Sequence, residues 1–264
     1  MRIRLLTSNV WADVFGNPVE PRDSLLADII ADYSPDVLFF EEMHPHWHEG
    51  KLKPRLYELG FVESKPDLNG KVLNYTPVFY KADRFDEILS GFHLYTGPND
   101  FDSNSYSLTC LREKKTGVKI GALATHFWFM WDEAGQSARE MNAKELIEAF
   151  DSLTDCAAVF CGGDFNCNEH SSPFEIMQQA GIVTSSKLAE KKKNFICTWH
   201  GDPIYDTDSG KYTPADTSTK PNDLSLDHIV VRGNAVIRSY EVISDERAQI
   251  VSDHCPVMIE AEIS

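Results

Sequence analysis

Apolar residues recur along the chain with two different periods, which predict strands in some segments and helices in others. From Met1 to Val10, charged and apolar residues first alternate and then give way to an apolar run that reaches Asn9, as in a strand that enters a core. Between Ser24 and Tyr33 apolar residues return at helical spacing, and Ser34 with Pro35 marks the end of that helix. The N-terminal segment is therefore predicted to form a strand followed by a helix.

Several further strands are predicted, and most of them end in polar residues. Three run directly into such residues: Asp36 to Phe40 into Glu41 and Glu42, Lys119 to Thr125 into His126, and Ala157 to Cys161 into Gly162, Gly163, Asp164, Phe165 and Asn166. Near the C-terminus, Leu226 to Val231 and Pro256 to Ile263 also have strand patterns, and the second alternates apolar with polar residues. The ends of the strands are thus the places where chemically active side chains collect.

Two more helices are predicted between these strands. In the first helix, Ser137 and Glu140 form a capping box. Its apolar face consists of Ala143, Leu146, Ile147 and Phe150. The second begins near Ser172, Pro173 and Glu175 and closes at Gly181. Two stretches, Gly97 to Ser107 and Lys191 to Ser225, have no regular pattern, and we expect such long loops to form the substrate-facing surface.

The length and composition of the chain predict one large domain over residues 1–264. With 264 residues, of which 42% are apolar, the chain can bury a substantial core. It contains no long apolar run that could span a membrane and no signal segment at its start, so we expect a soluble, cytoplasmic protein. The six cysteines lack CxxC spacing and the density of a disulfide scaffold, which predicts buried free thiols.

The net charge narrows the possible partners. Lysine and arginine total 25 against 41 aspartate and glutamate residues, which gives a formal charge of −16. Such a charge repels a polyanion at long range and argues against a protein that coats nucleic acid. Bound cations can reverse the potential inside one cleft, so a nuclease is disfavoured but stays possible.

The polar residues at the strand ends form a chemically uniform set of carboxylates, amides and imidazoles. They are Asn9, Glu42, His126, Asp164, Asn166, Asp227, Asp253 and His254. Hard oxygen ligands suit Mg²⁺ or Mn²⁺, and an ion of this kind would neutralise a phosphate group. Hydrolysis of a phosphate ester further needs an activated water and a proton for the departing oxygen, which histidines and carboxylates can supply. For His254, the distant Asp227 is a better orienting partner than its neighbour Asp253.

The arrangement of these segments resembles the endonuclease/exonuclease/phosphatase superfamily, which includes deoxyribonuclease I, sphingomyelinases and inositol-phosphate 5-phosphatases. Six segments carry the resemblance in family order over nearly the whole chain: Leu6 to Val10, Phe39 to Glu42, Ala124 to Phe127, Gly163 to Asn166, Leu226 to Ile229 and Ser252 to Val257. The GDFN and SDHCPV segments are the most specific of the six. The resemblance implies an α+β fold, a four-layer deoxyribonuclease I-like β-sandwich flanked by helices, with the site at one rim.

The resemblance also implies a role for each residue of the set. Glu42 would be the principal Mg²⁺ ligand, with Asn9 and Asp253 beside it in the metal shell. His254 would act as general base and be oriented by Asp227. Asp164 would align the attacking water, Asn166 would hydrogen-bond a phosphate oxygen, and His126 would assist as acid or phosphate ligand.

Three positions depart from the family pattern. Glu41 stands where glutamine is usual before the metal-binding glutamate, and its extra negative charge would tighten metal binding or alter a hydrogen bond behind the site. His228 stands where tyrosine is common, and Phe127 replaces a frequent leucine. None of these departures removes a catalytic group.

Several other features have both a functional and a structural interpretation. His44, His46 and His48 could form a second metal site, but we expect three surface histidines on a polar loop. The run from Phe127 to Trp131 could contact a base or a lipid tail, and we expect about half of it to pack in the core. Lys191 to Lys193 could clamp a phosphate but is predicted to be a solvated surface run, and Arg139 could pin a loop or reach the substrate.

The sequence thus favours a Mg²⁺-dependent phosphoesterase, possible also with Mn²⁺, whose substrate is a small or lipid-derived phosphate mono- or diester. A nuclease of the same superfamily is the alternative. A catalytically silent binding protein is a weaker third hypothesis, because every matched catalytic position keeps a competent side chain.

Overall fold

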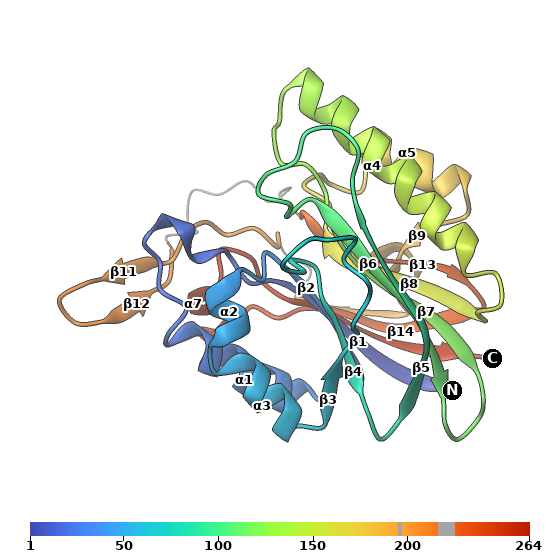
Figure 1. Ribbon diagram of the computed structural model, residues 1–264, viewed down its shortest axis with the longest axis horizontal. Helices are drawn as coiled ribbons and strands as arrows, with labels where there is room; N and C mark the ends of the chain where they lie inside the picture. The colour runs from blue at the N-terminus through green and yellow to red at the C-terminus, as the bar shows by residue number, and fades with distance from the viewer. Residues whose placement is uncertain (195–196, 216–224) are drawn as a thin grey trace.

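Two β-sheets pack face to face in the computed structural model, and helices cover both outer faces (Figure 1). The structure describes residues 1–194, 197–215 and 225–264. No helix in these ranges is long and apolar enough to cross a membrane.

The first sheet has seven strands and contains both ends of the chain. Their order is β10-β14-β15-β1-β2-β4-β3, and their bounds are β1 Arg2–Asn9, β2 Val37–Glu41, β3 Phe61–Glu63, β4 Val78–Lys81, β10 Lys191–Lys193, β14 Ala235–Val242 and β15 Val257–Ile263. Strand β1 lies at the centre, antiparallel to β15 and parallel to β2. Because β1 and β2 run in the same direction, Asn9 and Glu41 are partners at the same edge of the sheet.

The second sheet has six strands in the order β5-β6-β7-β8-β13-β9. Their bounds are β5 Phe85–Leu94, β6 Ser105–Glu113, β7 Lys119–His126, β8 Ala158–Asp164, β9 Val183–Thr184 and β13 Asp227–Gly233. Strands β7 and β8 are parallel, whereas β13 is antiparallel to β8. In this register Asp164 is the partner of both His126 and Asp227.

Helices form the two outer layers. Those on the first sheet include α1 Arg22–Tyr33, α2 Pro45–Glu49, α3 Leu52–Glu58 and α7 Ala248–Val251, and those on the second include α4 Glu133–Ser152 and α5 Ser172–Gln179. The remaining elements are the 3₁₀ turn η1 Asp13–Phe15, the short helix α6 Ser185–Leu188 and a hairpin of β11 Ile204–Asp206 with β12 Lys211–Thr213. The layers follow the order helix, sheet, sheet, helix, which confirms the predicted α+β sandwich.

The core between the sheets is formed by alternate residues of their central strands. Leu5, Phe39, Ile120, Phe160 and Ile259 are fully buried there. Gly162 in β8 faces this layer, and a methyl group added to it would lie 2.3 Å from the Phe39 ring and 2.9 Å from the Thr7 Cβ atom. The two sheets therefore approach each other closely at Gly162, two residues before the end of β8 at Asp164.

Some predicted elements differ from the structure. Helix α4 begins at Glu133, because the Asp132 carboxylate caps it by accepting the Gly135 N–H at 2.7 Å, and Ser137 lies inside the helix. The stretch from Gly97 to Ser107 is irregular only as far as strand β6. The Lys191 to Ser225 connection contains β10, β11 and β12, and its residues 195–196 and 216–224 lie outside the described part.

Candidate active site

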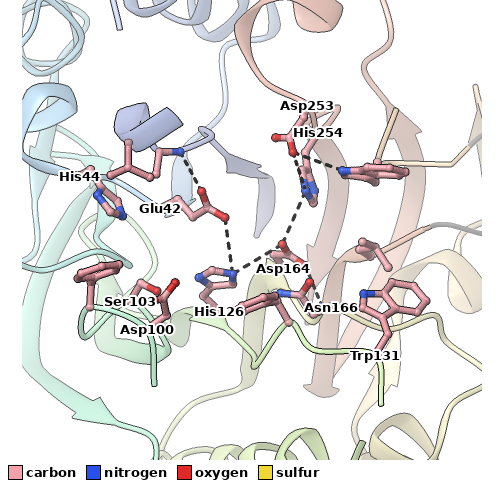
Figure 2. Close-up of a pocket in the computed structure, with 16 residues that line it drawn as sticks. Glu42, His44, Asp100, Ser103, His126, Trp131, Asp164, Asn166, Asp253 and His254 are labelled. Atoms are coloured by element: carbon pink, nitrogen blue, oxygen red, sulfur yellow. Dashed lines mark hydrogen bonds and ion pairs between the residues drawn. The ribbon is translucent and has the colours of Figure 1, made fainter. Parts of the chain in front are cut away.

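The eight predicted site residues converge at one rim of the sandwich. Four of them follow from the strand register, since Asn9, His126, Asp164 and Asp227 lie at the ends of β1, β7, β8 and β13. Figure 2 shows Glu42, His126, Asp164 and His254 directed toward a common space. Residues from both sheets thus face one cavity, with Asn9 and Asp227 in contact with the residues that line it.

His254 and Asp227 form a buried hydrogen-bonded pair. The Nδ1 atom of His254 lies 2.7 Å from Oδ2 of Asp227, and both side chains are almost fully buried. Burial alone would lower the pKa of His254, but Asp227, Asp253 and Asp164 outweigh it and raise this pKa well above its ordinary value. With Nδ1 held by Asp227, the Nε2 atom faces the cavity, 3.9 Å from Asp164 and 3.8 Å from Asp253.

Asp164 and Asn9 form the floor of the site. The Asn9 amide nitrogen donates to Oδ2 of Asp164 and to Oε1 of Glu42, each at 3.0 Å, while the Asn9 oxygen accepts the Trp11 N–H at 2.9 Å. Asp164 accepts a further hydrogen bond from the Asn166 N–H at 2.8 Å. Burial, opposed by His254, raises the pKa of Asp164. Asn9 therefore holds two carboxylates side by side, through its nitrogen rather than its oxygen.

Glu42 is turned into the cavity by an unusual backbone conformation. Its φ angle is 58°, in the left-handed region that costs a non-glycine residue about 1–3 kcal/mol and is concentrated at functional sites. Its Oε2 atom accepts the Ala12 N–H at 2.8 Å. Burial opposes ionisation of Glu42, but His126, the Ala12 N–H and the Asn9 amide outweigh burial and lower its pKa.

His126 lies between the carboxylates of the two sheets. Its Nε2 atom is 3.8 Å from both Glu42 Oε1 and Asp164 Oδ2. Figure 2 marks both contacts with dashed lines. The Nδ1 atom is buried and has no hydrogen-bond partner among the described residues. The ring can therefore present Nε2 to a group bound in the cavity.

Asp253 completes the opposite wall. Its Oδ2 atom accepts the Trp199 indole N–H at 3.3 Å, and the Ser252 hydroxyl donates to its Oδ1 atom at 3.2 Å. Burial, countered by His254 but reinforced by Glu42, raises the pKa of Asp253 to about 7. Asp253 and Glu42 both line the cavity, so their carboxylates repel each other there.

The donor set fits a hard divalent cation. Glu42, His126 and Asp164 offer ligand atoms within 4.8 Å of one another, and Asp164, Asp227 and His254 form a second such group. Within the described part of the chain, the cavity wall has four carboxylates, three histidines and no lysine or arginine. A bound cation would relieve the repulsion among these buried carboxylates, so Glu42, with Asp253 and Asp164 nearby, is where it would be held.

Asn166 is positioned for polar contact, and its local conformation suits its residue type. Its φ angle is 50°, which asparagine adopts more readily than most residues. Its side-chain nitrogen donates to the Phe127 carbonyl at 3.0 Å, and the residue lines the cavity. One amide hydrogen is thus used to fix the side chain, and the other is available to a ligand.

Glu41 does not line the cavity, in spite of its place beside Glu42. It is fully buried, its Oε1 atom accepts the Thr7 hydroxyl at 3.0 Å, and its Oε2 atom has no partner among the described residues. Burial, with repulsion from Asp227 and Asp164, raises the pKa of Glu41 well above its ordinary value. Its charge is therefore suppressed, so of the two predicted effects an altered hydrogen bond behind the site fits better than tighter metal binding.

The structure also corrects three smaller predictions. His44 is buried and lines the cavity, whereas His46 is exposed beside Asp13 and His48 bonds the Asn74 carbonyl at 2.9 Å, so the three histidines are not one surface group. Four of the six cysteines are buried, but Cys156 and Cys197 are only half-buried. Of the run from Phe127 to Trp131, Phe127 is fully buried and Trp128 is half-buried, whereas Phe129, Met130 and Trp131 are exposed, so less of the run packs in the core than expected. Phe129 and Trp131 line the cavity.

Arg22 supports the site but was missed in the sequence. It is fully buried, and its guanidinium donates to the carbonyls of Val10, Trp11, Asn17 and Val251 at 2.9–3.2 Å while it stacks on Trp11 and Trp47. It thereby joins the loop after β1 to the segment that leads to Asp253.

Two further supporting residues, Trp199 and Thr198, were also missed in the sequence. Trp199 donates to Asp253, and the Thr198 hydroxyl accepts the Leu226 and Asp227 N–H groups at 2.9 and 3.0 Å.

Comparison with known proteins places this geometry in context. Residues 6–254 match the model of the Endonuclease/Exonuclease/phosphatase family. None of the curated proteins compared with the chain gives a significant sequence match.

Three solved structures illustrate the likeness in fold. An endonuclease/exonuclease/phosphatase from Bacteroides vulgatus has a TM-score of 0.81 at 20% identity, with both chains fully covered. A mannosyl-6-phosphatase from Bacteroides thetaiotaomicron has a TM-score of 0.78 at 19% identity, covering 99% of this chain and 100% of the other. D. rerio TDP2, complexed with a single-strand DNA product, has a TM-score of 0.72 at 17% identity, with 99% of each chain covered.

Proposed function

The chain belongs to the endonuclease/exonuclease/phosphatase family, and on this basis we propose that it is a Mg²⁺-dependent phosphoesterase that hydrolyses a small or lipid-derived phosphate ester. The observation that carries the proposal is the buried His254–Asp227 pair, which opens onto the same cavity as Glu42 and Asp253. This arrangement combines a base with a site for a cation, the two requirements of phosphate ester hydrolysis by water.

The proposed mechanism begins with the placement of the phosphate between the two walls. Glu42 and Asp253 would hold the cation, with Asn9 beside them, and Mn²⁺ could replace Mg²⁺ in such an oxygen-rich site. When bound, the cation neutralises the charge on the phosphate oxygens. Asn166 donates its remaining amide hydrogen to a phosphate oxygen, and His126 contacts the phosphate through Nε2.

Proton transfer is assigned to His254. Three carboxylates raise the pKa of His254, and a bound cation would offset their charge. With Nδ1–H held by Asp227, the Nε2 atom would then accept a proton from the attacking water. Asp164, fixed by Asn9 and by the Asn166 N–H, aligns that water. The departing alcohol oxygen takes a proton from an acid of the site, for which His126 is the assigned group.

The lining of the cavity favours this function over a nuclease. A nuclease groove must attract several phosphates, which requires local lysine or arginine. Among the described residues that line the cavity there is neither, and four carboxylates face it. For this reason we do not propose DNA as a substrate, although the similarly folded D. rerio protein is complexed with a single-strand DNA product.

A substrate panel with matched variants tests the proposal. Phosphate mono- and diesters of sugars, inositol and lipids, together with DNA and RNA oligonucleotides, are incubated with Mg²⁺, Mn²⁺ or EDTA, and phosphate or alcohol release is measured. We expect metal-dependent turnover of a non-nucleic substrate that His254→Ala abolishes. His170→Ala is the control, because His170 is a histidine with a 79% exposed side chain. Wild-type turnover in His254→Ala, or turnover of oligonucleotides alone, would contradict the proposal.

A further inference from the structure

Four exposed apolar side chains line the cavity. Phe101, Phe129 and Trp131 are 73%, 41% and 60% exposed and line it together with Val14, which is 56% exposed. Large apolar side chains gathered in this way at a cavity usually mark a surface that binds an apolar group. The proposed mechanism, which needs only the polar residues of the floor, leaves these side chains without a role.

The loop that carries Phe129 and Trp131 is held rigidly by its backbone. The Arg139 guanidinium donates to the carbonyls of Trp128 and Met130 at 3.1 and 2.5 Å. The Asn142 side chain accepts the Trp128 N–H at 3.1 Å. None of these hydrogen bonds involves the side chains of Phe129 and Trp131, so main-chain contacts position the loop while both rings stay exposed at the cavity.

The loop that carries Phe101 is fixed in a comparable way. Phe101 and Asp102 have φ angles of 50° and 64°, in the left-handed region, which is uncommon for phenylalanine and less so for aspartate. The Asn104 side chain closes the loop by accepting the Asp100 N–H at 3.0 Å and by donating to the Phe127 carbonyl at 3.0 Å. The Phe127 carbonyl also accepts a hydrogen bond from the Asn166 side chain. The loops that carry Phe101 and Phe129 are therefore both connected to the floor of the site.

The charge of the cavity restricts what these rings can contact. The described residues of its wall include the carboxylates of Glu42, Asp100, Asp164 and Asp253 but no lysine or arginine. A second phosphate on the substrate would be repelled, whereas an uncharged apolar group would not be. The cavity has a volume of about 660 Å³, which suits a small molecule.

We propose that Phe101, Phe129 and Trp131 form a subsite for an apolar alcohol group of the substrate, adjacent to the scissile phosphate. This inference rests on the proposed function and names the substrate class. Water adds its oxygen to phosphorus, the bond from phosphorus to the alcohol oxygen breaks, and that oxygen takes one proton. The water gives up one proton in this step. The products are the free apolar alcohol and a phosphate that carries the water oxygen together with its three other oxygens.

The first experiment compares alcohols of different polarity in the same reaction. Glycerol, octanol and 3-phenylpropanol are presented as phosphate monoesters and as methyl phosphate diesters, below any micelle concentration and with Mg²⁺. We expect kcat/KM to be higher for the two apolar alcohols than for glycerol, and the octyl and phenylpropyl arms report whether alkyl or aromatic groups are preferred.

Variants of the subsite residues then test whether these side chains cause the preference for apolar alcohols. We expect Trp131→Ala and Phe101→Ala each to lower kcat/KM for the preferred apolar ester about tenfold, the size expected when part of an apolar pocket is lost. The glycerol ester should change less than twofold. Met130→Ala is the matched control, since Met130 is 42% exposed in the same loop but does not line the cavity.

A binding measurement separates failure of the subsite from failure of the proposed function. Octylphosphonate and methylphosphonate, which water does not cleave, are titrated into the protein with Mg²⁺ in a calorimeter. Tighter binding of octylphosphonate that Trp131→Ala removes supports the subsite, even if no ester is turned over and the proposed function falls. Equal affinity for the two phosphonates, or equal losses on the glycerol and apolar esters in the variants, would overturn the subsite.

Discussion

The imidazole of His254 and the carboxylate of Asp227 meet at 2.7 Å, although the two residues come from opposite sheets of the sandwich. Asp227 begins β13, where it is the register partner of Asp164, and His254 precedes β15. The pair therefore exists only when the two sheets are correctly packed, which links the stability of the sandwich to its chemistry.

Replacing Asp227 with asparagine tests the orienting role of this pair. We expect kcat to fall by roughly 10²- to 10⁴-fold, the size of a lost general-base contribution, because an amide does not stabilise the imidazolium. Thermal unfolding of the same sample checks that the fold is retained. Asp155→Asn is the control, since its side chain is 86% exposed. A loss of less than about threefold in kcat would remove Asp227 from the mechanism.

Metal binding should be visible without turnover. Because Mg²⁺ would bind only to the folded protein, we expect it to raise the melting temperature, corresponding to about 2.7 kcal/mol at a concentration of 100 times Kd. Glu42→Gln should abolish most of this shift, whereas Glu20→Gln, with an exposed side chain, should keep it. Differential scanning calorimetry with Mg²⁺ and with EDTA measures the effect. An unchanged shift in Glu42→Gln would contradict its assignment as the principal ligand.

The close approach of the two sheets predicts a large effect of one methyl group. Gly162→Ala would place Cβ at 2.3 Å from the Phe39 ring, so the core must shift, at a cost of typically 1–3 kcal/mol in the free energy of unfolding. Gly91→Ala is the control in another strand, where the nearest atom would be a flexible leucine side chain at 3.4 Å. Urea unfolding measures both variants, and equal stability of the two would contradict the packing.

The buried His228 predicts loss of stability in mild acid. Burial, opposed by its bond to the Cys167 carbonyl, lowers the pKa of His228 below its ordinary 6.5. Below pH 6.5 the unfolded chain therefore binds a proton at His228 more readily than the folded protein does. As a result, the free energy of unfolding falls as the pH decreases through 6.5, by at most about 1.4 kcal/mol per pH unit.

Replacing this histidine isolates its contribution. His228→Phe should lose about 1 kcal/mol at pH 7 through the missing hydrogen bond, but its stability should decline less between pH 7 and pH 5 than that of the wild type. His170→Ala should retain the wild-type pH dependence. Urea unfolding at several pH values provides the comparison, and equal slopes for His228→Phe and the wild type would rule out the effect.

The strand ends of the site could be predicted from the sequence because their signal is local. An apolar run that stops at Asn9, His126 or Asp164 marks both the strand and its end. Strand β5 gave no comparable signal, since it is a half-buried edge strand whose register shifts between Glu87 and Leu89. The start of α4 was misplaced because Asp132 and Ser137 are both good capping residues, and only the fold selects Asp132.

The supporting residues could not be predicted because their roles depend on distant contacts. A charged residue at the start of a helix, such as Arg22, is normally exposed, and only the folded chain brings the Val251 carbonyl to it. The same holds for Trp199, whose partner Asp253 lies 54 positions further along the chain. The sequence thus predicted the residues that converge at the cavity, whereas residues that hold them in place were missed.

The hydrogen bonds around the Phe127 carbonyl have a consequence for the way this enzyme can diversify. Asn104, Asn166 and Arg139 all bind main-chain carbonyls of residues 127, 128 and 130, so they do not depend on which side chains occupy positions 129 and 131. Those two positions can therefore accept other amino acids while the geometry of the residues beneath them stays the same. Mutational drift, or a designed library restricted to this loop, could then give the protein new preferences without first rebuilding its reaction centre.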